Sequence, residues 1–151
     1  MNNIISEIKI LKLTYYLLGK TIFKTCVKQN VTPIIFQEFC NSQKCSDAFR
    51  LKYRDGLTVE EIAEQLNYDV RSIYKRFDRD MYTFGRWLTQ DCSNANTFKN
   101  MKNQLEMELC AEYNKREIII TDNKAWNKLR SDCLKKLSQR IDDSINNIII
   151  K

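Results

Sequence analysis

Residues 57–77 read LTVEEIAEQLNYDVRSIYKRF, and they decide how the rest of the chain is interpreted. Thr58 and Glu61 have the spacing of a capping box, in which each side chain bonds the backbone amide of the other at the start of a helix. Asn67 tolerates the left-handed backbone of a turn, and Asp69 is a good cap for a second helix. The stretch therefore predicts two short helices joined by a tight turn.

The apolar positions of these two helices each fall on one side. Ile62, Ala63 and Leu66 share a face of the first helix, and Ala63 is small where the two helices must approach closely. Ile73 and Phe77 lie four residues apart on the second helix, whose other side is polar and basic. This is the physical form of a helix-turn-helix, whose second helix can enter the major groove of DNA.

Charge is divided unevenly between the two helices. Residues 58–66 contain glutamates and no cation, and residues 70–86 contain Arg71, Lys75, Arg76, Arg79 and Arg86 against Asp78 and Asp80. Positive charge is thus concentrated where a groove-entering helix needs it, because phosphate neutralisation supplies most of the sequence-independent affinity for DNA. The whole chain carries a formal charge of +6.

The exposed positions of the second helix are candidate DNA contacts. Those expected to face base edges are Val70, Arg71, Tyr74 and Lys75. Arginine or lysine can bond guanine O6 and N7, and valine can contact a thymine methyl group. The side chains expected to hold phosphates are Ser72, Arg76 and Arg79, together with Thr58 at the start of the first helix.

A family resemblance rests on Tyr53, Gly56, Leu57, Thr58, Glu61, Ile62, Ala63, Leu66, Ser72, Ile73 and Phe77. Residues 50–80 resemble the helix-turn-helix of sigma-factor region 4 and of its relatives in response regulators and small phage regulators. Asn67 stands where that family commonly has glycine, and Asp69 where it commonly has a capping serine. The size of the chain and its central motif are similar to phage or mobile-element transcriptional regulators of the ArpU or RinA kind. The resemblance implies a sequence-specific DNA-binding transcriptional regulator.

The rest of the chain predicts an all-α, multi-helix fold, because Gly (3) and Pro (1) are scarce and apolar residues recur at helical spacing. Helices are expected over 3–29, from Thr32-Pro33 to Asn41-Ser42, from Ser46 or Asp47 to Asp55-Gly56, over 97–117 and over 122–150. The second helix of the motif is expected to continue to residue 90. Residues 118–121 fit a short strand, a loop packed on the core or a helix end.

We expect three regions: an N-terminal helical region (1–45), a helix-turn-helix DNA-binding region (46–90) and a C-terminal helical region (97–151) with a possible role in dimerisation. The terminal helix has an apolar stripe at Trp126, Leu129, Cys133, Leu137, Ile141, Ile145 and Ile148. The first helix has another at Ile4, Ile5, Ile8, Leu11, Tyr15, Leu18 and Ile22. Both stripes favour a homodimer, and the alternative is that both pack on the core of their own chain.

Two other functions fit the same features. The motif could engage RNA polymerase or a sigma factor as a protein-interaction module, or serve DNA packaging or plasmid maintenance. The lysines of the first helix (Lys9, Lys12, Lys20, Lys24 and Lys28) are typical of a solvated face, with a membrane-surface helix as the alternative. We expect double-stranded DNA as the partner and no membrane.

The six cysteines include no Cys-x-x-Cys pair, and the chain has no histidine. The expected state is reduced, mostly buried thiols in a cytoplasmic protein without a signal peptide, with structural zinc, thiol chemistry or disulfides as alternatives. Without histidine the commonest general base is missing, and no glycine-rich phosphate loop is present. We therefore expect no enzyme, no catalytic residues, no cofactor and no metal site.

Overall fold

The computed structural model describes the backbone of residues 2–27 and 34–149 and the side chains of residues 4–27, 34–137 and 139. Within these residues all regular structure is helical, as expected from the sequence. The helices are α1 (Asn2–Val27), α2 (Ile34–Asn41), α3 (Asp47–Tyr53), α4 (Val59–Leu66), α5 (Val70–Gln90), α6 (Ala95–Lys115) and α7 (Asn123–Ile149). The expected start at Thr32-Pro33 lies outside the described residues.

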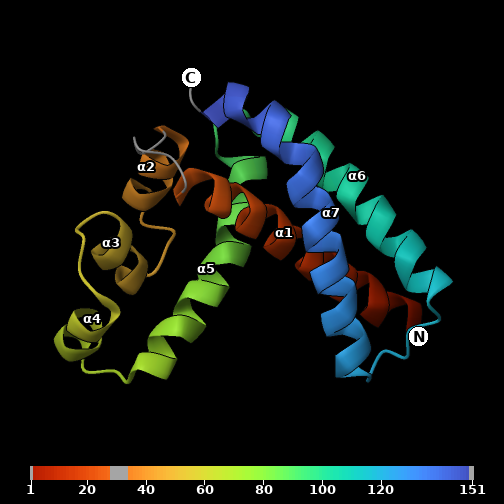
Figure 1. The fold of residues 1–151 in the computed structure, drawn as a ribbon, viewed down its shortest axis with the longest axis horizontal. Coiled ribbons are helices and arrows are strands. Elements are labelled where there is room, and N and C mark those ends of the chain that lie inside the picture. Colours follow the sequence, from red (N-terminus) through yellow and green to blue (C-terminus); the bar gives the residue numbers. More distant parts are fainter. Residues whose placement is uncertain (1, 28–33, 150–151) are drawn as a thin grey trace.

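Helix α1 is the centre of the arrangement (Figure 1). Helix α5 crosses it, and α6 and α7 lie side by side along its N-terminal half. Helices α2, α3 and α4 gather on the other side, next to α5. From the crossing with α1, the N-terminal half of α5 and the N-terminal half of α7 extend as two diverging arms.

The crossing of α1 and α5 is made by two glycines. A Cβ atom on Gly19 would lie 1.9 Å from the carbonyl oxygen of Met81, and one on Gly85 would lie 1.9 Å from the carbonyl oxygen of Tyr15. Both distances are far below van der Waals contact, so the two backbones touch where these glycines meet. The third glycine, Gly56, has φ +80° and forms the turn after α3.

The side of α1 that faces the core differs from the stripe expected from its sequence. Ile4, Ile5 and Ile8 are 64%, 52% and 51% exposed, so the N-terminal part of that stripe faces away from the core. The buried side combines Ile10, Leu17, Leu18 and Ile22 with Thr14, Thr21 and Thr25. These threonines can be buried because each hydroxyl donates to the carbonyl oxygen four residues earlier, at 2.7–3.1 Å.

Aromatic rings fill the space between α2, α3 and α5. Phe39 of α2 packs 4.6 Å from Phe84 and 5.6 Å from Phe49, measured between ring centroids. Phe36 lies 5.7 Å from Phe49. All four rings are buried, so this cluster joins the two short helices to α5 through apolar burial.

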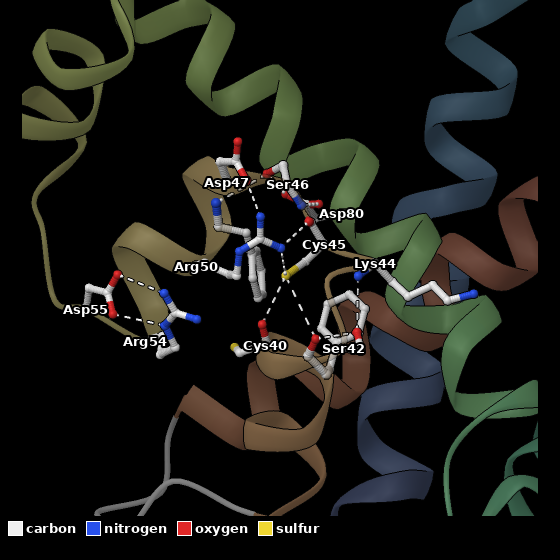
Figure 2. Close-up of polar contacts among 12 residues, drawn as sticks. Cys40, Ser42, Lys44, Cys45, Ser46, Asp47, Arg50, Arg54, Asp55 and Asp80 are labelled. Carbon is white, nitrogen blue, oxygen red and sulfur yellow. Dashed lines mark hydrogen bonds and ion pairs between the residues drawn. The ribbon is translucent and has the colours of Figure 1, made fainter.

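A buried carboxylate fixes the start of α3 on α5 (Figure 2). Asp80 accepts hydrogen bonds from the backbone N–H of Ser46 (2.8 Å) and from its hydroxyl (2.6 Å). The same hydroxyl oxygen accepts from the N–H of Phe49 and so caps α3. Burial raises the pKa of Asp80 above its ordinary value of 3.8, while the bonds from Ser46 oppose the rise.

The C-terminal part closes on the other side of α1. Residues 118–121 form a turn packed on the core, because Ile118 is buried and the carbonyl oxygen of Ile120 accepts from Trp126 Nε1 and from Lys9 Nζ, both at 3.0 Å. Asp122 accepts from the N–H of Ala125, which confirms its expected capping role. Among the described side chains of α7, Trp126, Leu129, Cys133 and Leu137 are buried, and they pack on the core of the same chain. The side chains of Ile141, Ile145 and Ile148 lie outside the described residues.

Some expected boundaries were wrong by a few residues. Helix α3 ends at Tyr53 because the turn through Gly56 begins earlier than expected, and α6 spans 95–115 where 97–117 was expected. The continuation of the motif's second helix to residue 90 is confirmed. Cys110 is half-buried, the other five cysteines are buried, and all six are free thiols. No helix within the described part of the chain is both long and apolar enough to cross a membrane.

At the two glycines of the α1–α5 crossing, we expect substitution by alanine to destabilise the protein, which is the reverse of its usual effect within a helix. Alanine ordinarily stabilises a helix interior by about 1 kcal/mol relative to glycine. We expect Gly19→Ala and Gly85→Ala instead to lower the free energy of unfolding by about 1–3 kcal/mol or more, because the added methyl group forces the backbones apart. Urea unfolding measures the change. Asn103→Ala, at an exposed position of α6, is the control for propensity alone, and a stabilised G85A protein would contradict the close approach.

The contact between Asp80 and Ser46 predicts that removing the Asp80 carboxylate destabilises the protein. We expect Asp80→Ala to lower the free energy of unfolding by about 1–3 kcal/mol because the Ser46 N–H loses its acceptor, and Asp80→Asn to cost less because its amide oxygen still accepts.

Folding raises the pKa of Asp80, so the folded state binds the proton more readily than the unfolded chain. The stability of the wild-type protein relative to D80N should therefore increase as the pH falls from neutrality through the raised pKa towards 3.8. Urea titrations of both proteins at several pH values measure the difference. A difference that moves the other way would mean that the carboxylate is favoured on folding.

Candidate nucleic-acid interface

Helices α4 and α5 meet as the sequence predicts. The Thr58 hydroxyl accepts from the Glu61 N–H, and the Thr58 N–H donates to Glu61 Oε1, both at 3.2 Å, which completes the capping box. Asn67 has φ 58° and ends α4 in the left-handed region. Asp69 then accepts from the Ser72 N–H at 2.7 Å and caps α5. The hydrogen bond from Ser72 lowers the pKa of the Asp69 carboxyl group.

A small apolar cluster holds α3, α4 and α5 together. Its buried members are Ala48, Val59, Ile62 and Ile73. The expected inward positions Ile62 and Ile73 are fully buried, and Phe77 is half-buried between this cluster and the main core. With the inner face occupied, the opposite side of α5 is left to the solvent.

The exposed side of α5 carries most of the candidate contacts. Val70 is 37% and Tyr74 58% exposed, and Arg71, Lys75 and Arg79 are exposed as well. Ser72 is half-buried. The side chain of Arg76 is also half-buried, with its guanidinium 4.3 Å from the centre of the Tyr68 ring. The Thr58 hydroxyl is exposed but is already engaged in the capping box.

The candidate residues border two separate hollows. Arg71, Tyr74 and Lys75 line a hollow of about 480 Å³ together with Lys20 and Phe23 of α1. Lys75 and Arg79 line a larger one of about 690 Å³ between α5, α1 and α7. Lys75 is common to both.

A polar cluster joins α1, α5 and α7 at the larger hollow. The Tyr16 hydroxyl donates to Asp78 Oδ1 at 2.9 Å, and Arg130 donates to the Tyr16 oxygen. The Arg130 guanidinium lies 4.1 Å from the centre of the Tyr16 ring and 3.9 Å from Asp78 Oδ1. Burial, followed by the hydrogen bond to Asp78, raises the pKa of Tyr16. Asp78, the acidic side chain of α5 that lines this hollow, is thereby partly neutralised.

The contribution of α1 to this surface is not predicted from the sequence. Lys9, Lys12, Tyr16 and Lys20 border the two hollows, and from the sequence the three lysines are expected only on a solvated or membrane-surface face. Their spacing of three and four residues places them on one side of α1, which was a readable signal. That this side turns towards α5 could not be read from the spacing, because it depends on the glycine crossing. No protein-family model, curated protein or solved structure matches the chain.

The turn between α4 and α5 predicts an unusual order of stability at residue 67. We expect Asn67→Gly to preserve the free energy of unfolding and Asn67→Ala to lower it by about 1 kcal/mol, since the left-handed backbone disfavours residues with a Cβ. Urea unfolding of both variants measures the order. At Asn100, an exposed position inside α6, the same pair of substitutions should give the opposite order. Equal effects at the two positions would contradict the strained turn.

Proposed function

We propose that α3, α4 and α5 form a helix-turn-helix and that the protein is a sequence-specific DNA-binding transcriptional regulator. The observation that carries the proposal is the combination at α5 of a capped N-terminus, a buried inner side and an exposed side with Arg71, Lys75 and Arg79. A recognition helix needs these properties together, because its first turns must reach base edges while its inner side holds the domain together.

The division of roles follows from the positions on the helix. Arg71, near the start of α5, reads base edges together with Val70, Tyr74 and Lys75. Arg79 lies two turns further on and holds a phosphate, where it contributes affinity without sequence preference. The ring of Tyr68 holds the guanidinium of Arg76 beside the turn, a position suited to a second phosphate contact. Ser72 and the N-terminus of α4 at Thr58 complete the proposed phosphate contacts.

A homodimer is part of the proposal. The stripe of α7 is used within the chain as far as Leu137, so it is not the surface that supports dimerisation there. The exposed Ile4, Ile5 and Ile8 are the better support, since three neighbouring isoleucines on one side of a helix favour contact with an apolar partner. A second copy would also place two recognition helices on one DNA site.

One observation favours the rival function, a protein-interaction module that engages RNA polymerase or a sigma factor. Tyr68, Val70 and Tyr74 are exposed at the start of α5, and aromatic and aliphatic side chains are typical of protein interfaces. In vitro selection from random duplex DNA with the full-length protein separates the two. Enrichment of a defined motif supports DNA recognition, whereas weak, salt-sensitive retention without a motif supports the rival.

Two substitutions that each remove one positive charge from α5 should have different effects on DNA binding. Arg71→Gln should weaken binding to the selected sequence by about 1–3 kcal/mol and relax its specificity. Arg79→Gln should weaken binding to selected and random DNA alike and reduce the salt dependence of binding by about one unit of slope. Fluorescence anisotropy titrations at several salt concentrations measure both. Lys99→Gln, at an exposed position of α6, is the control for net charge. Equal losses on both DNAs for both variants would contradict these roles.

A further inference from the structure

The hollow between α1, α5 and α7 has the dimensions of a small-molecule site. Its volume is about 690 Å³, within the range of about 300–1,000 Å³ that is usual for ligand pockets. Three helices that are distant in sequence form its walls. It therefore exists only in the folded chain.

Its surface is apolar between the charged groups. Leu13 and Tyr16 of α1, Tyr82 of α5 and Trp126 of α7 all line the hollow. Tyr16 is held in place by Asp78 and Arg130, and Trp126 by the hydrogen bond from its Nε1 to Ile120. Tyr16 and Trp126 are thus held in place before any ligand arrives, so ligand binding costs little side-chain entropy at these two positions.

The charges around this surface are strongly unbalanced. Lys9, Lys12, Lys75, Arg79 and Arg130 line the hollow, and Asp78 is its one acidic lining residue. Lys9 is engaged by Ile120 and by the Trp126 ring, 4.9 Å away, and Arg130 by Tyr16 and Asp78. Lys12, Lys75 and Arg79 form no ion pair with any carboxylate of the described residues.

We propose that this hollow binds a small amphipathic organic anion. The apolar body of the ligand lies against Leu13, Tyr16 and Tyr82, and its carboxylate, sulfonate or phosphate group is held by Lys12, Lys75 and Arg79. Three unpaired cations beside an apolar surface complement this class of ligand, because the anion supplies the missing charge while its body is removed from water.

If the protein binds DNA as proposed, a ligand in this hollow also affects DNA binding. Lys75 and Arg79 are also proposed DNA contacts, so an anion in the hollow takes up the charges that would otherwise meet bases and phosphates. The ligand and DNA therefore compete, and the ligand acts as an effector that releases the protein from DNA. Ligand binding itself does not depend on this step.

The first experiment uses 8-anilinonaphthalene-1-sulfonate as probe and the full-length protein without DNA. Binding is followed by probe fluorescence and by energy transfer from tryptophan. N-phenyl-1-naphthylamine, which has the same rings and no sulfonate, is the matched neutral probe. We expect the sulfonate to bind more tightly than the neutral probe by about tenfold or more, since charge-assisted contacts hold it.

Two variants locate the probe. The double variant Lys12→Gln with Arg79→Gln should weaken the sulfonate about tenfold and leave the neutral probe unchanged, and Lys99→Gln with Lys115→Gln on α6 is the control of equal charge. Asn127→Trp fills the hollow from an exposed position of α7 and should abolish binding of both probes. Circular dichroism melting verifies that each variant is folded. Equal affinity of the two probes, or sulfonate binding unaffected by the variants, would overturn the site.

The second experiment adds the sulfonate to the complex with selected DNA. Release of DNA from the wild-type protein but not from Asn127→Trp supports competition. Simultaneous binding of probe and DNA would overturn the competition and leave the site standing. Failure of the DNA selection would remove the proposed function without affecting the probe measurements, so the two failures are distinguishable.

Discussion

The contact between Gly19 and Gly85 is the constraint on which the rest of the structure depends. Because neither residue has a Cβ, α1 and α5 approach until the backbone of one touches the backbone of the other. This approach fixes which sides of the two helices face one another. It therefore determines where α6 and α7 can pack on α1, and it brings Lys75, Asp78 and Arg79 of α5 close to Tyr16 of α1. Both the proposed DNA-binding side of α5 and the hollow between α1, α5 and α7 depend on this contact.

Local features of the fold could be predicted because their causes are local. The Thr58–Glu61 capping box, the left-handed Asn67 and the Asp69 cap each involve residues within four positions of one another, so the sequence contains the whole interaction. The long continuation of α5 was predictable for the same reason. The side of α1 that faces the core was not. The hydroxyls of its buried threonines form hydrogen bonds within the helix. Because threonine is polar, the sequence pattern gives no indication that these positions are buried.

In the candidate site, too, the features with local causes were predictable and those that depend on tertiary packing were not. Exposure of Arg71, Tyr74 and Lys75 followed from the helical period and is confirmed. The positions of Arg76 over Tyr68 and of Arg130 over Tyr16 depend on how side chains meet in space, in the second case across 114 positions of the chain. The lysines of α1 lie between these cases. Their common side was readable from the spacing, but the surface they complete is formed by α5 and α7, whose placement is a tertiary result.

Helix α5 runs without a break from the glycine crossing to its exposed N-terminus. Between Val70 and Gly85 it contains no proline and no other glycine, so this segment lacks the residues at which helices usually kink. At a rise of 1.5 Å per residue, Val70 lies roughly 22 Å from the crossing, and a rotation of about 10° would carry it about 4 Å. That displacement is close to the roughly 3.4 Å separation of successive base pairs. A small change in the angle between α1 and α5 is therefore amplified along α5, and under the proposed function it would shift the N-terminus of the helix by about one base-pair step.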